Sequence, residues 1–258
     1  MFHVKQTKIY TEFYMNFTEF YSICLEIWAA NPDLPPITQE QAQKLHALTA
    51  RMLEVNKSMN LTAIKDEEAI ILRHYADSLT VSKYISEGAS IIDVGCGAGF
   101  PTLPLAIFRP DISITSLDST AKRIEYVKHT ASMLGLNNVN GIAERAEVLA
   151  NEPKYRESFD YATARAVAAM PILTELCLPF VRIGGAFIAM KAAKGSDEAK
   201  ISENAIAKCG GKLIEVVECP LSDRDGNEEQ RVIIRVQKQS GTPKEFPRHY
   251  SKISKKPL

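Results

Sequence analysis

Three alternating glycines form the most informative pattern of this 258-residue chain, because their spacing suits a turn that holds a ligand. Gly95, Gly97 and Gly99 lie within the stretch Asp93–Pro101, which reads Asp-Val-Gly-Cys-Gly-Ala-Gly-Phe-Pro. Glycine permits a tight turn and a close approach of the backbone to a ligand, because it has no Cβ. The stretch is therefore the first candidate for a binding site.

Mostly apolar residues flank the glycines on both sides, at positions 90–92 and 103–108. This arrangement predicts a buried strand, a glycine-rich turn and then a helix. The first turn of such a helix has unpaired N–H groups and the positive end of the helix dipole, so it attracts an anionic group. We expect the turn to bind the anionic part of a ligand.

The spacing of the glycines distinguishes between two classes of ligand. A dinucleotide-binding turn has the pattern Gly-x-Gly-x-x-Gly, but Phe100 stands where its third glycine would be. Asp93 precedes the first glycine by two positions, and Asp-x-Gly-x-Gly-x-Gly resembles the first motif of Rossmann-like methyltransferases that use S-adenosylmethionine. A methyltransferase is favoured, with a dinucleotide enzyme and a glycine turn without a ligand as the alternatives.

A second anchor for a nucleoside follows at the end of the next predicted strand. Asp118 lies 23 residues after Gly95, close to the spacing of about 20 residues at which an acidic residue binds ribose hydroxyls. A carboxylate accepts two hydrogen bonds at once, which suits a vicinal diol. We predict that Asp118, with Ser119 and Thr120, binds the ribose. The alternative is that Asp118 caps the helix predicted over residues 121–134.

The composition leaves the partner open and argues against several classes of site. Lysine and arginine number 31, as do aspartate and glutamate, so a surface for nucleic acid must be a local basic patch. Five scattered cysteines without a Cys-x-x-Cys pair argue against a zinc site and favour free thiols in a reducing cytosol. There is no run of about 18 apolar residues and no signal-peptide core, so we expect a cytoplasmic protein.

Helical patterns precede a region in which strands and helices alternate. Thr38 is predicted to cap one helix, and a second helix is predicted over residues 67–85. We interpret residues 1–14 as an extension. Alternation from Ile91 onward predicts a parallel sheet. The strands are predicted at residues 91–94, 112–117, 139–143, 161–163, 186–191, 212–218 and 231–237.

The last two predicted strands are joined only by residues 219–230, which have a polar, loop-like pattern, so we expect them to pair antiparallel. The predicted fold class is α/β: a Rossmann-like sheet of seven strands, mostly parallel with an antiparallel final hairpin, and an α-helical N-terminal extension. We assign residues 1–88 to a helical region, 89–241 to a methyltransferase core, and 242–258 to a basic C-terminal tail on or near the core.

Further segments resemble one family in particular, the RsmG (also called GidB) methyltransferases. The matches occur in order from about residue 15 to residue 258, which is far more specific than any single motif. They are Asn60–Ile64, His74 with Asp77–Leu79, Asp93–Pro101 with Pro104–Ile107, Leu117–Ser119, Arg145–Glu147, Thr163–Ala168, Gly184–Gly185 with Lys191, Gly210–Gly211, Thr242–Lys244 and Phe246–Arg248. Enzymes of this family methylate N7 of a guanosine in bacterial 16S ribosomal RNA. The resemblance implies S-adenosylmethionine as cofactor and small-subunit ribosomal RNA, or the ribosomal subunit, as partner.

The resemblance also implies a set of cofactor-binding residues. This set is Gly95, Gly97, Gly99, Phe100, Asp118, Ser119, Thr120, Ala146, Glu147 and Arg165. The glycines and Phe100 come to the methionine half of the cofactor, and Ala146 and Glu147 come to the adenine. Phe100 is alternatively core filler, and Glu147 is alternatively a solvated acid at a helix start.

Arg165 follows the fourth predicted strand, at the sheet edge where ligands of α/β folds bind. It stands among small apolar residues and needs a partner, because an unpaired buried charge is costly. The structural alternative is a pair with Asp93 or Asp160. The functional reading, which the resemblance favours, pairs Arg165 with the cofactor or with RNA phosphate.

His74 and Asp77 lie three positions apart on one predicted helix face, and with Asn60 and Arg165 they are the candidates for positioning the reactants. Each of the first three has a structural role as the alternative. The chain has neither the Asn/Asp-Pro-Pro-Tyr/Phe motif used on exocyclic amines nor a Pro-Cys nucleophile. Guanine N7 has a free lone pair and no proton. We therefore expect no general base, and catalysis by positioning and desolvation.

The tail predicts contact with RNA, because cations alternate there with two aromatic residues, Phe246 and Tyr250. The predicted RNA-binding residues are Lys191, Lys244, Arg248, Lys252, Lys255 and Lys256. A solvated terminus is the alternative. The tail also departs from the family pattern, since His249-Tyr250-Ser251 lacks the expected Pro-Gly. A second departure lies after the glycine turn, where Thr102 stands at a position at which glycine is common.

We expect neither a metal nor a membrane as partner. The sequence does not specify the oligomeric state, and we predict a monomer. Two rival functions are a methyltransferase that acts on another substrate and a cofactor-binding protein that serves in ribosome assembly.

Overall fold

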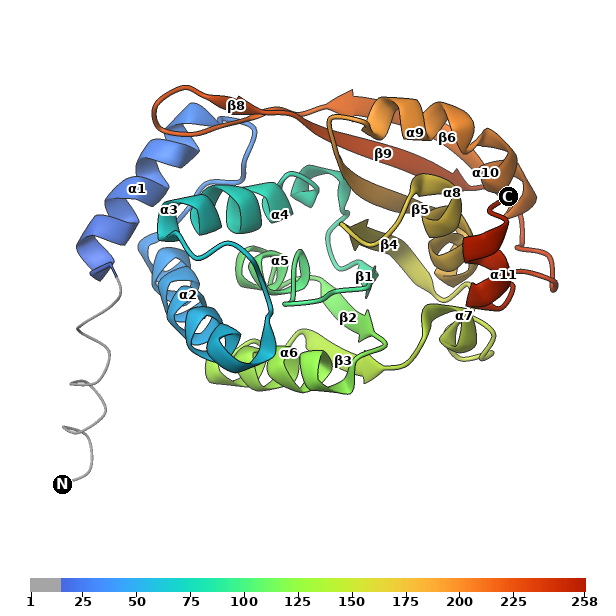
Figure 1. Ribbon diagram of the computed structural model, residues 1–258, viewed down its shortest axis with the longest axis horizontal. Helices are drawn as coiled ribbons and strands as arrows, with labels where there is room; N and C mark the ends of the chain where they lie inside the picture. Colours follow the sequence, from blue (N-terminus) through green and yellow to red (C-terminus); the bar gives the residue numbers. More distant parts are fainter. Residues whose placement is uncertain (1–14) are drawn as a thin grey trace.

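A seven-stranded sheet forms the centre of the computed structural model, which describes residues 15–258 (Figure 1). The strand order is β3-β2-β1-β4-β5-β9-β6. The bounds are β1 Ser90–Val94, β2 Ser113–Asp118, β3 Val139–Ala143, β4 Phe159–Arg165, β5 Val181–Ala192, β6 Gly211–Glu218 and β9 Arg231–Lys238. Strands β1 to β5 pair in parallel, whereas β9 runs antiparallel to β5 and β6. The predicted fold class is confirmed.

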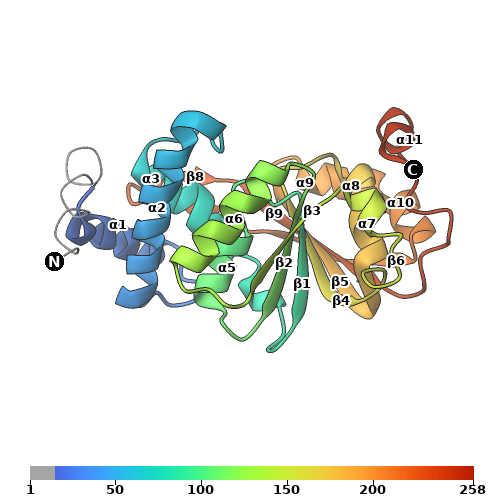
Figure 2. The same ribbon diagram turned by 90° about the horizontal axis from the view of Figure 1, so that it is seen from below.

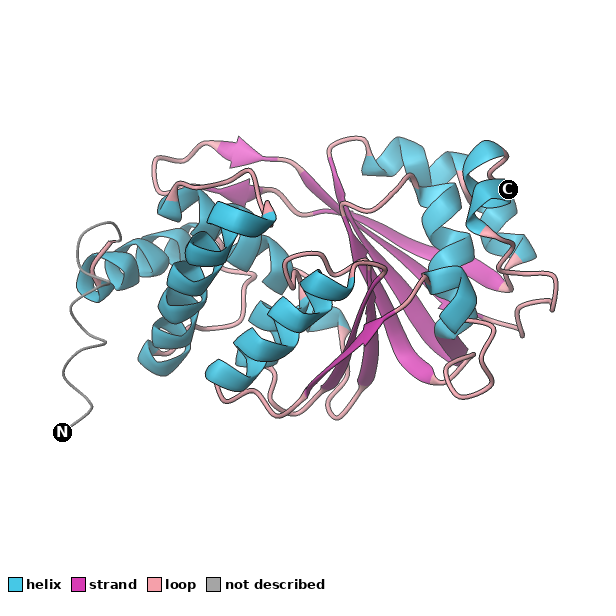
Figure 3. Ribbon diagram, turned by 60° about the horizontal axis from the view of Figure 1, so that its bottom comes forward, coloured by secondary structure: helices cyan, strands magenta, loops and turns pink. Residues whose placement is uncertain are grey.

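Helices cover both faces of the sheet (Figure 3), and neighbouring side chains of the central strands enter two separate cores. In β1, Ile91 belongs to one core and Ile92 to the other, and in β5 Ile188 and Phe187 divide in the same way. Successive side chains of a strand point to opposite faces, so a strand covered on both faces needs apolar residues at consecutive positions. This requirement explains the short unbroken apolar runs from which the strands were predicted.

The helices before β1, together with α5 and α6, lie on one face of the sheet (Figure 2). Their bounds are α1 Phe17–Ala30, α2 Gln39–Met59, α3 Glu67–Ile70, η1 Ile71–Ala76, α4 Asp77–Leu79, η2 Ser82–Tyr84, α5 Thr102–Phe108 and α6 Ala121–Met133. Thr38 caps α2 through a reciprocal pair of hydrogen bonds with Gln41, as predicted. Because all these helices share one core, the domain boundary at residue 88 stays a prediction. The extension assigned to residues 1–14 lies outside the described residues.

The single helix predicted over residues 67–85 is wrong in its detail, because η1 is a π-helical segment and the regular helix ends at Leu79. Two side-chain hydroxyl groups in this stretch donate hydrogen bonds to backbone carbonyl groups. Ser78 Oγ donates to His74 O, and Thr80 Oγ1 donates to Asp77 O at 2.7 Å. Such local side-chain hydrogen bonds compete with the regular helical ladder. π-helical segments are frequent at functional sites, and this one carries His74.

The remaining helices cover the other face of the sheet (Figure 2). Their bounds are α7 Ala146–Leu149, α8 Met170–Cys177, η3 Leu178–Phe180, α9 Gly195–Ile201, α10 Glu203–Lys208 and α11 Tyr250–Lys255. Helix α11 lies beside α8, and Ile253 buries its side chain in this core. The tail is thus packed on the sheet layer. Within residues 15–258, no helix combines the length and apolar character needed to cross a membrane.

Residues 219–230, predicted as a loop, contain a short hairpin of β7 Leu221–Ser222 and β8 Glu228–Glu229. The hairpin reaches across to the end of α1 (Figure 1). There Asn31 Nδ2 donates to Ser222 O at 2.7 Å, and Ser222 N–H donates to Asn31 Oδ1 at 2.9 Å. The paired backbone satisfies polar groups that a bare loop would leave to water.

Candidate active site

A cavity of about 370 Å³ opens at the carboxyl ends of β1 and β2. This is the edge of an open α/β sheet at which ligands bind. The lining residues are Val94, Gly95, Leu117, Asp118, Ser119, Arg123, Glu144, Arg145, Ala146, Glu147, Ala166, Val167, Leu176 and Tyr250. Five predicted cofactor residues, namely Gly95, Asp118, Ser119, Ala146 and Glu147, therefore meet in one cavity.

The three glycines of the turn have different structural roles. All three have positive φ, a conformation that favours glycine. A Cβ on Gly95 would lie 2.6 Å from Val167 Cγ2, and a Cβ on Gly99 would lie 2.6 Å from Leu103 Cδ1. A Cβ on Gly97 would meet nothing nearer than a backbone oxygen at 4.0 Å. Gly95 and Gly99 thus allow close packing of the protein, and Gly97 faces open space.

Asp118 holds the glycine turn against the loop that follows β2. Its Oδ2 accepts from Gly97 N–H at 3.1 Å, and its Oδ1 accepts from Thr120 N–H at 2.8 Å. Thr120 occupies the N-cap position of α6 and no side chain caps this end, so the alternative in which Asp118 caps the helix is not what the structure shows. A carboxylate has about four acceptor positions. Oδ2 also accepts from Arg123 Nη1 at 3.4 Å, so Asp118 retains one acceptor position, on Oδ1, for a hydroxyl in the cavity.

Asp93 lies beneath the turn and is buried. Its Oδ2 accepts from Thr102 Oγ1 at 2.7 Å, and its Oδ1 accepts from Thr163 Oγ1 at 3.3 Å. Burial raises the pKa of Asp93 to about 6, although both hydroxyls oppose the shift. Thr102, which departs from the glycine common in the family pattern, thus supplies a hydrogen bond that a glycine lacks. Asp93 supports the turn from below and does not line the cavity.

Glu147 and Arg145 form the far wall of the cavity. Glu147 is buried, and its Oε1 accepts from Arg145 Nε at 2.7 Å, so it is not a solvated acid. The Arg145 guanidinium carbon lies 5.0 Å from the ring centroid of Tyr250, which reaches the cavity from α11. Sequence reasoning placed neither Arg145 nor Tyr250 in the cofactor site. The run Arg145-Ala146-Glu147 was the available signal for Arg145, and no local signal pointed to Tyr250.

Arg165 is paired with Asp77 and with neither Asp93 nor Asp160, so the predicted structural partners were wrong. Its Nη1 donates to Asp77 Oδ2 and to Arg73 O, both at 2.9 Å. Asp160 instead accepts from Ser90 and Arg182 near the opposite end of the strands. The pair of Arg165 and Asp77 joins the end of β4 to the N-terminal helices, and neither residue lines the cavity.

His74 is buried between Phe100 and the guanidinium of Arg165. Its ring stacks on Phe100 with centroids 4.4 Å apart, and Arg165 Nη2 lies 3.4 Å from Nδ1. Burial, reinforced by the charge of Arg165, lowers the pKa of His74 to about 3. The ring is therefore neutral near pH 7. Since Nδ1 faces a donor, the proton belongs on Nε2, which lies 2.9 Å from Thr62 Oγ1.

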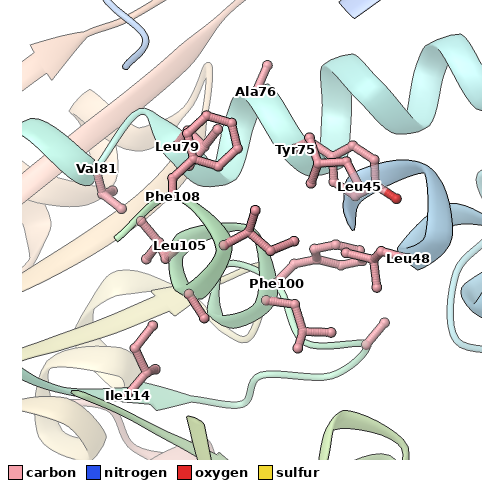
Figure 4. Close-up of a cluster of buried hydrophobic side chains, with 14 of the residues drawn as sticks. Leu45, Leu48, Tyr75, Ala76, Leu79, Val81, Phe100, Leu105, Phe108 and Ile114 are labelled. Atoms are coloured by element: carbon pink, nitrogen blue, oxygen red, sulfur yellow. The ribbon is translucent and has the colours of Figure 1, made fainter. Parts of the chain in front are cut away.

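Phe100 and Asn60 lie outside the cavity wall. Phe100 is buried in the cluster that contains Leu45, Leu48 and Tyr75 (Figure 4). It therefore has the core role given as the alternative, and it supports His74 from one side. Asn60 ends α2 in a left-handed conformation with φ 50° and lines a separate hollow of about 780 Å³. Neither residue is among the residues that line the first cavity.

Two of the predicted RNA-binding cations point into the protein. Lys191 Nζ donates to Ala168 O at 2.6 Å and pairs with Glu198 at 2.7 Å, and its side chain is only 9% exposed. Arg248 binds both carboxylate oxygens of Glu175, which is 0% exposed. The other four predicted RNA-binding residues are lysines of the tail, and they are exposed. These are Lys244, Lys252, Lys255 and Lys256.

The groups in the cavity fit S-adenosylmethionine, which presents ribose hydroxyls, an adenine and an amino acid carboxylate. Gly95 is the glycine of the turn that lines the cavity, whereas Gly97 faces open space but is not among the lining residues. Asp118 retains one acceptor position for a ribose hydroxyl, and Ala146 and Leu176 offer apolar surface to a planar ring. The volume of about 370 Å³ lies within the usual range for sites of small ligands.

Comparison with known proteins agrees with this assignment. The model of the family described as rRNA small subunit methyltransferase G matches residues 41–226. The ribosomal RNA small subunit methyltransferase G of Alkaliphilus metalliredigens is 42% identical over 86% of this chain and 92% of the relative. The protein of the same name from Staphylococcus carnosus is 43% identical, with the same coverage of both chains.

Solved structures show the fold at low identity. The [4+2]-cyclase SpnF has a TM-score of 0.54 and 15% identity, over 81% of this chain and 99% of that one. The M. jannaschii TYW2 structure in complex with AdoMet has a TM-score of 0.50 and 17% identity, over 63% of this chain and 75% of that one. The cyclase illustrates that this fold alone does not specify a reaction. The family model and the relatives at about 40% identity do: the chain belongs to the rRNA small subunit methyltransferase G family.

Proposed function

We propose that the protein methylates N7 of one guanosine in 16S ribosomal RNA, with S-adenosylmethionine as the methyl donor. The observation that carries the proposal is the cavity at the glycine turn, where Gly95 and Asp118 fit the donor, in a chain of the rRNA small subunit methyltransferase G family. Bacterial 16S RNA is the small-subunit RNA that this family name implies as substrate. The reaction is expected in the cytoplasm, where ribosomal subunits assemble.

The residues of the turn and of its neighbouring loops bind and orient the donor. S-adenosylmethionine, when bound, supplies a methyl group that its sulfonium activates for transfer. Gly95 leaves room for the donor, and Asp118 accepts a hydrogen bond from the ribose. Val167, in the loop after β4, packs on Gly95 and lines the same cavity. Fixed orientation of two reactants lowers the barrier without any proton transfer.

Direct transfer to N7 is consistent with the state of the nearby titratable groups. Guanine N7 offers a lone pair and carries no proton, so nothing has to be removed to form the nucleophile. His74 is neutral and held between Phe100 and Arg165. Both oxygens of Asp77 are occupied by arginines, Arg165 and Arg231. We infer that His74 and Asp77 position the loops of the site and do not act as a general base.

The RNA must present an accessible base. N7 lies in the deep, narrow groove of paired RNA, so the target guanine has to be unpaired or turned out of the helix. We propose that the exposed tail lysines 244, 252, 255 and 256 contact phosphates nearby. Lys191 and Arg248 are paired with carboxylates, so we assign them to positioning of the loop after β4 and of the tail.

The test is mass spectrometry of 16S RNA after incubation with purified protein and S-adenosylmethionine. Unmodified naked RNA and unmodified small subunits are compared as substrates. One new N7-methylguanosine at a single position supports the reaction, the substrate and the atom together. Methylation of a different atom would refute direct transfer to N7. Binding of the donor without any methylation of either substrate would refute 16S RNA as the acceptor.

A further inference from the structure

Tyr250 lines the cavity from a segment in which this chain departs from the family pattern. It belongs to the segment His249-Tyr250-Ser251, which stands where the family pattern has Pro-Gly. In this chain the segment begins the short helix α11, and His249 Nδ1 accepts from Ser251 N–H at its start. The side chain of Tyr250 lines the same cavity as Asp118, Ala146 and Glu147.

The segment before Tyr250 is attached firmly to the core. Arg156 donates to four carbonyl groups, those of Ala150, Thr242, Pro243 and Phe246, at 2.8 to 3.2 Å. Arg156 thus holds the start of the tail against the loop after α7. A large number of donors on one planar guanidinium suits such a role.

Two further contacts anchor the tail on either side of Tyr250. Arg248 forms a two-pronged pair with the fully buried Glu175 of α8, at 2.8 and 2.6 Å. Ile253 is itself fully buried in the core of that face. Charge-assisted pairs with two parallel hydrogen bonds are among the more geometrically specific interactions in proteins. The position of Tyr250 at the cavity is therefore set by its neighbours in the chain.

Arg145 holds the ring of Tyr250 from the opposite wall. Its guanidinium lies over the ring at 5.0 Å, and the same guanidinium donates through Nε to the buried Glu147. Glu147 and Ala146 follow β3, the strand beside the one that ends at Asp118. With the ribose at Asp118, the base of the nucleoside comes to this end of the cavity. An aromatic ring is suited to contact the face of a purine there.

We propose that Tyr250 contacts the purine ring of the bound cofactor and is a cofactor-binding residue of this chain. The proposal rests on the proposed use of S-adenosylmethionine. The tail thereby forms one wall of the purine end of the site. Its lysines 252, 255 and 256 remain exposed while Tyr250 faces inward.

The test measures binding of S-adenosylhomocysteine by isothermal titration calorimetry. Tyr250→Ala should weaken binding about 30-fold, the middle of the range for loss of one base–aromatic contact. Tyr250→Phe keeps the ring and should bind like the wild type. Tyr250→Leu keeps an apolar side chain against the core but loses the ring, so it should keep the wild-type Tm and lose affinity. Wild-type affinity in both Tyr250→Ala and Tyr250→Leu would overturn the proposal.

A second probe locates the contact within the ligand. 5′-Methylthioadenosine has the adenosine but lacks the amino acid end, so Tyr250→Leu should weaken it by the same factor as S-adenosylhomocysteine. A loss confined to S-adenosylhomocysteine would place Tyr250 at the amino acid end and refute the purine contact. Tyr155→Ala is the matched control, because Lys154 lies over the Tyr155 ring at 4.9 Å, outside the cavity.

The outcomes separate this proposal from the proposed function. Wild-type protein that binds S-adenosylhomocysteine but leaves 16S RNA unmethylated would refute the RNA reaction alone. Wild-type protein that binds neither probe would refute the cofactor assignment and the role of Tyr250 together. Normal methylation by the wild type, with unchanged ligand affinity in the Tyr250 variants, would refute only the role of Tyr250.

Discussion

The carboxylate of Asp77 binds Arg165 with one oxygen and Arg231 with the other, at 2.9 and 3.2 Å. Arg165 ends β4 and Arg231 begins β9, and Asp77 belongs to the helical layer that precedes the sheet. Because β9 is antiparallel to β5, its first residue lies at the same edge as the last residue of β4. One carboxylate therefore joins the N-terminal helices to two strands beside the candidate active site.

Asp77→Ala should destabilise the protein by about 3 kcal/mol, because it leaves two mostly buried guanidinium groups without their shared partner. Denaturation in urea, followed by circular dichroism, measures this change. Asp197→Ala is the control, since its pair with Lys200 is exposed and 3.8 Å long, and should change stability by less than about 0.5 kcal/mol. A similar small change in Asp77→Ala would show that the arginines find other partners.

His74 should make stability depend on pH. Its folded pKa, about 3, lies below the usual histidine value of 6.5, so the unfolded chain binds more protons between these values. The contribution of His74 is therefore complete above pH 6.5 and decreases as the pH falls towards 3. The pKa of Asp93 is raised to about 6, so the contribution of Asp93 to the free energy of unfolding grows as the pH falls through 6. It therefore opposes the contribution of His74 in part of this range.

The contribution of His74 is isolated by comparing the wild type with His74→Gln at several pH values. The difference in free energy of unfolding should shrink as the pH falls from 7 to 4. A difference that stays constant over this range would show that His74 is not held neutral in the folded protein.

Gly97→Ala and Gly99→Ala should differ in what they damage. Both impose positive φ on alanine, at a cost of about 1 kcal/mol. Only at Gly99 does the new Cβ also meet a side chain, Leu103, at 2.6 Å, so this variant should be clearly less stable. At Gly97 the methyl group meets no protein atom nearer than 4.0 Å, and because the Gly97 N–H holds Asp118, this variant should weaken binding of S-adenosylhomocysteine more than it lowers stability. Calorimetry of both variants measures their affinity for S-adenosylhomocysteine, and thermal unfolding measures their stability. Equal affinity in Gly97→Ala and the wild type would show that Gly97 does not belong to the site.

Replacing lysines 252, 255 and 256 by glutamine should weaken RNA binding without affecting the cofactor site. Each lost phosphate contact reduces the slope of log affinity against log salt by about 0.7–0.9, so the slope should fall by about 2. Filter binding of 16S RNA at several salt concentrations measures it. The control replaces lysines 200, 208 and 212, which lie outside the tail. Equal slopes in the two triple variants would assign the tail no phosphate contacts.

The features that could be predicted from sequence are those encoded by local pattern. Consecutive apolar residues such as Ile91 and Ile92 predict a strand buried on both faces, and Thr38 with Gln41 predicts a helix start. The glycine turn and Asp118 could be placed together because their spacing along a βαβ unit is nearly constant. The seven strands and their antiparallel end were therefore predicted correctly from residue patterns.

The features that could not be predicted depend on contacts between distant segments. Arg165 and Asp77 lie 88 positions apart, and nothing near either residue indicates the other as partner. Lys191 looked free for RNA, yet Glu198 neutralises it across the turn that follows β5. Tyr250 reaches the cavity only because Arg248 binds Glu175 and Ile253 enters the core. In each case, a tertiary contact decides whether a charged or aromatic residue faces inward.

The link between Asn31 and Ser222 bears on the order in which the chain folds during synthesis. It spans 191 positions and fixes the β7–β8 hairpin to the end of α1. The N-terminal helices therefore leave the ribosome long before the hairpin that secures them, and β9 follows later still. Until the hairpin and β9 have been synthesised, part of the apolar surface of these helices stays uncovered. Contacts between residues so far apart in the sequence also form slowly. We expect these helices to be the part of the nascent chain that depends most on chaperones.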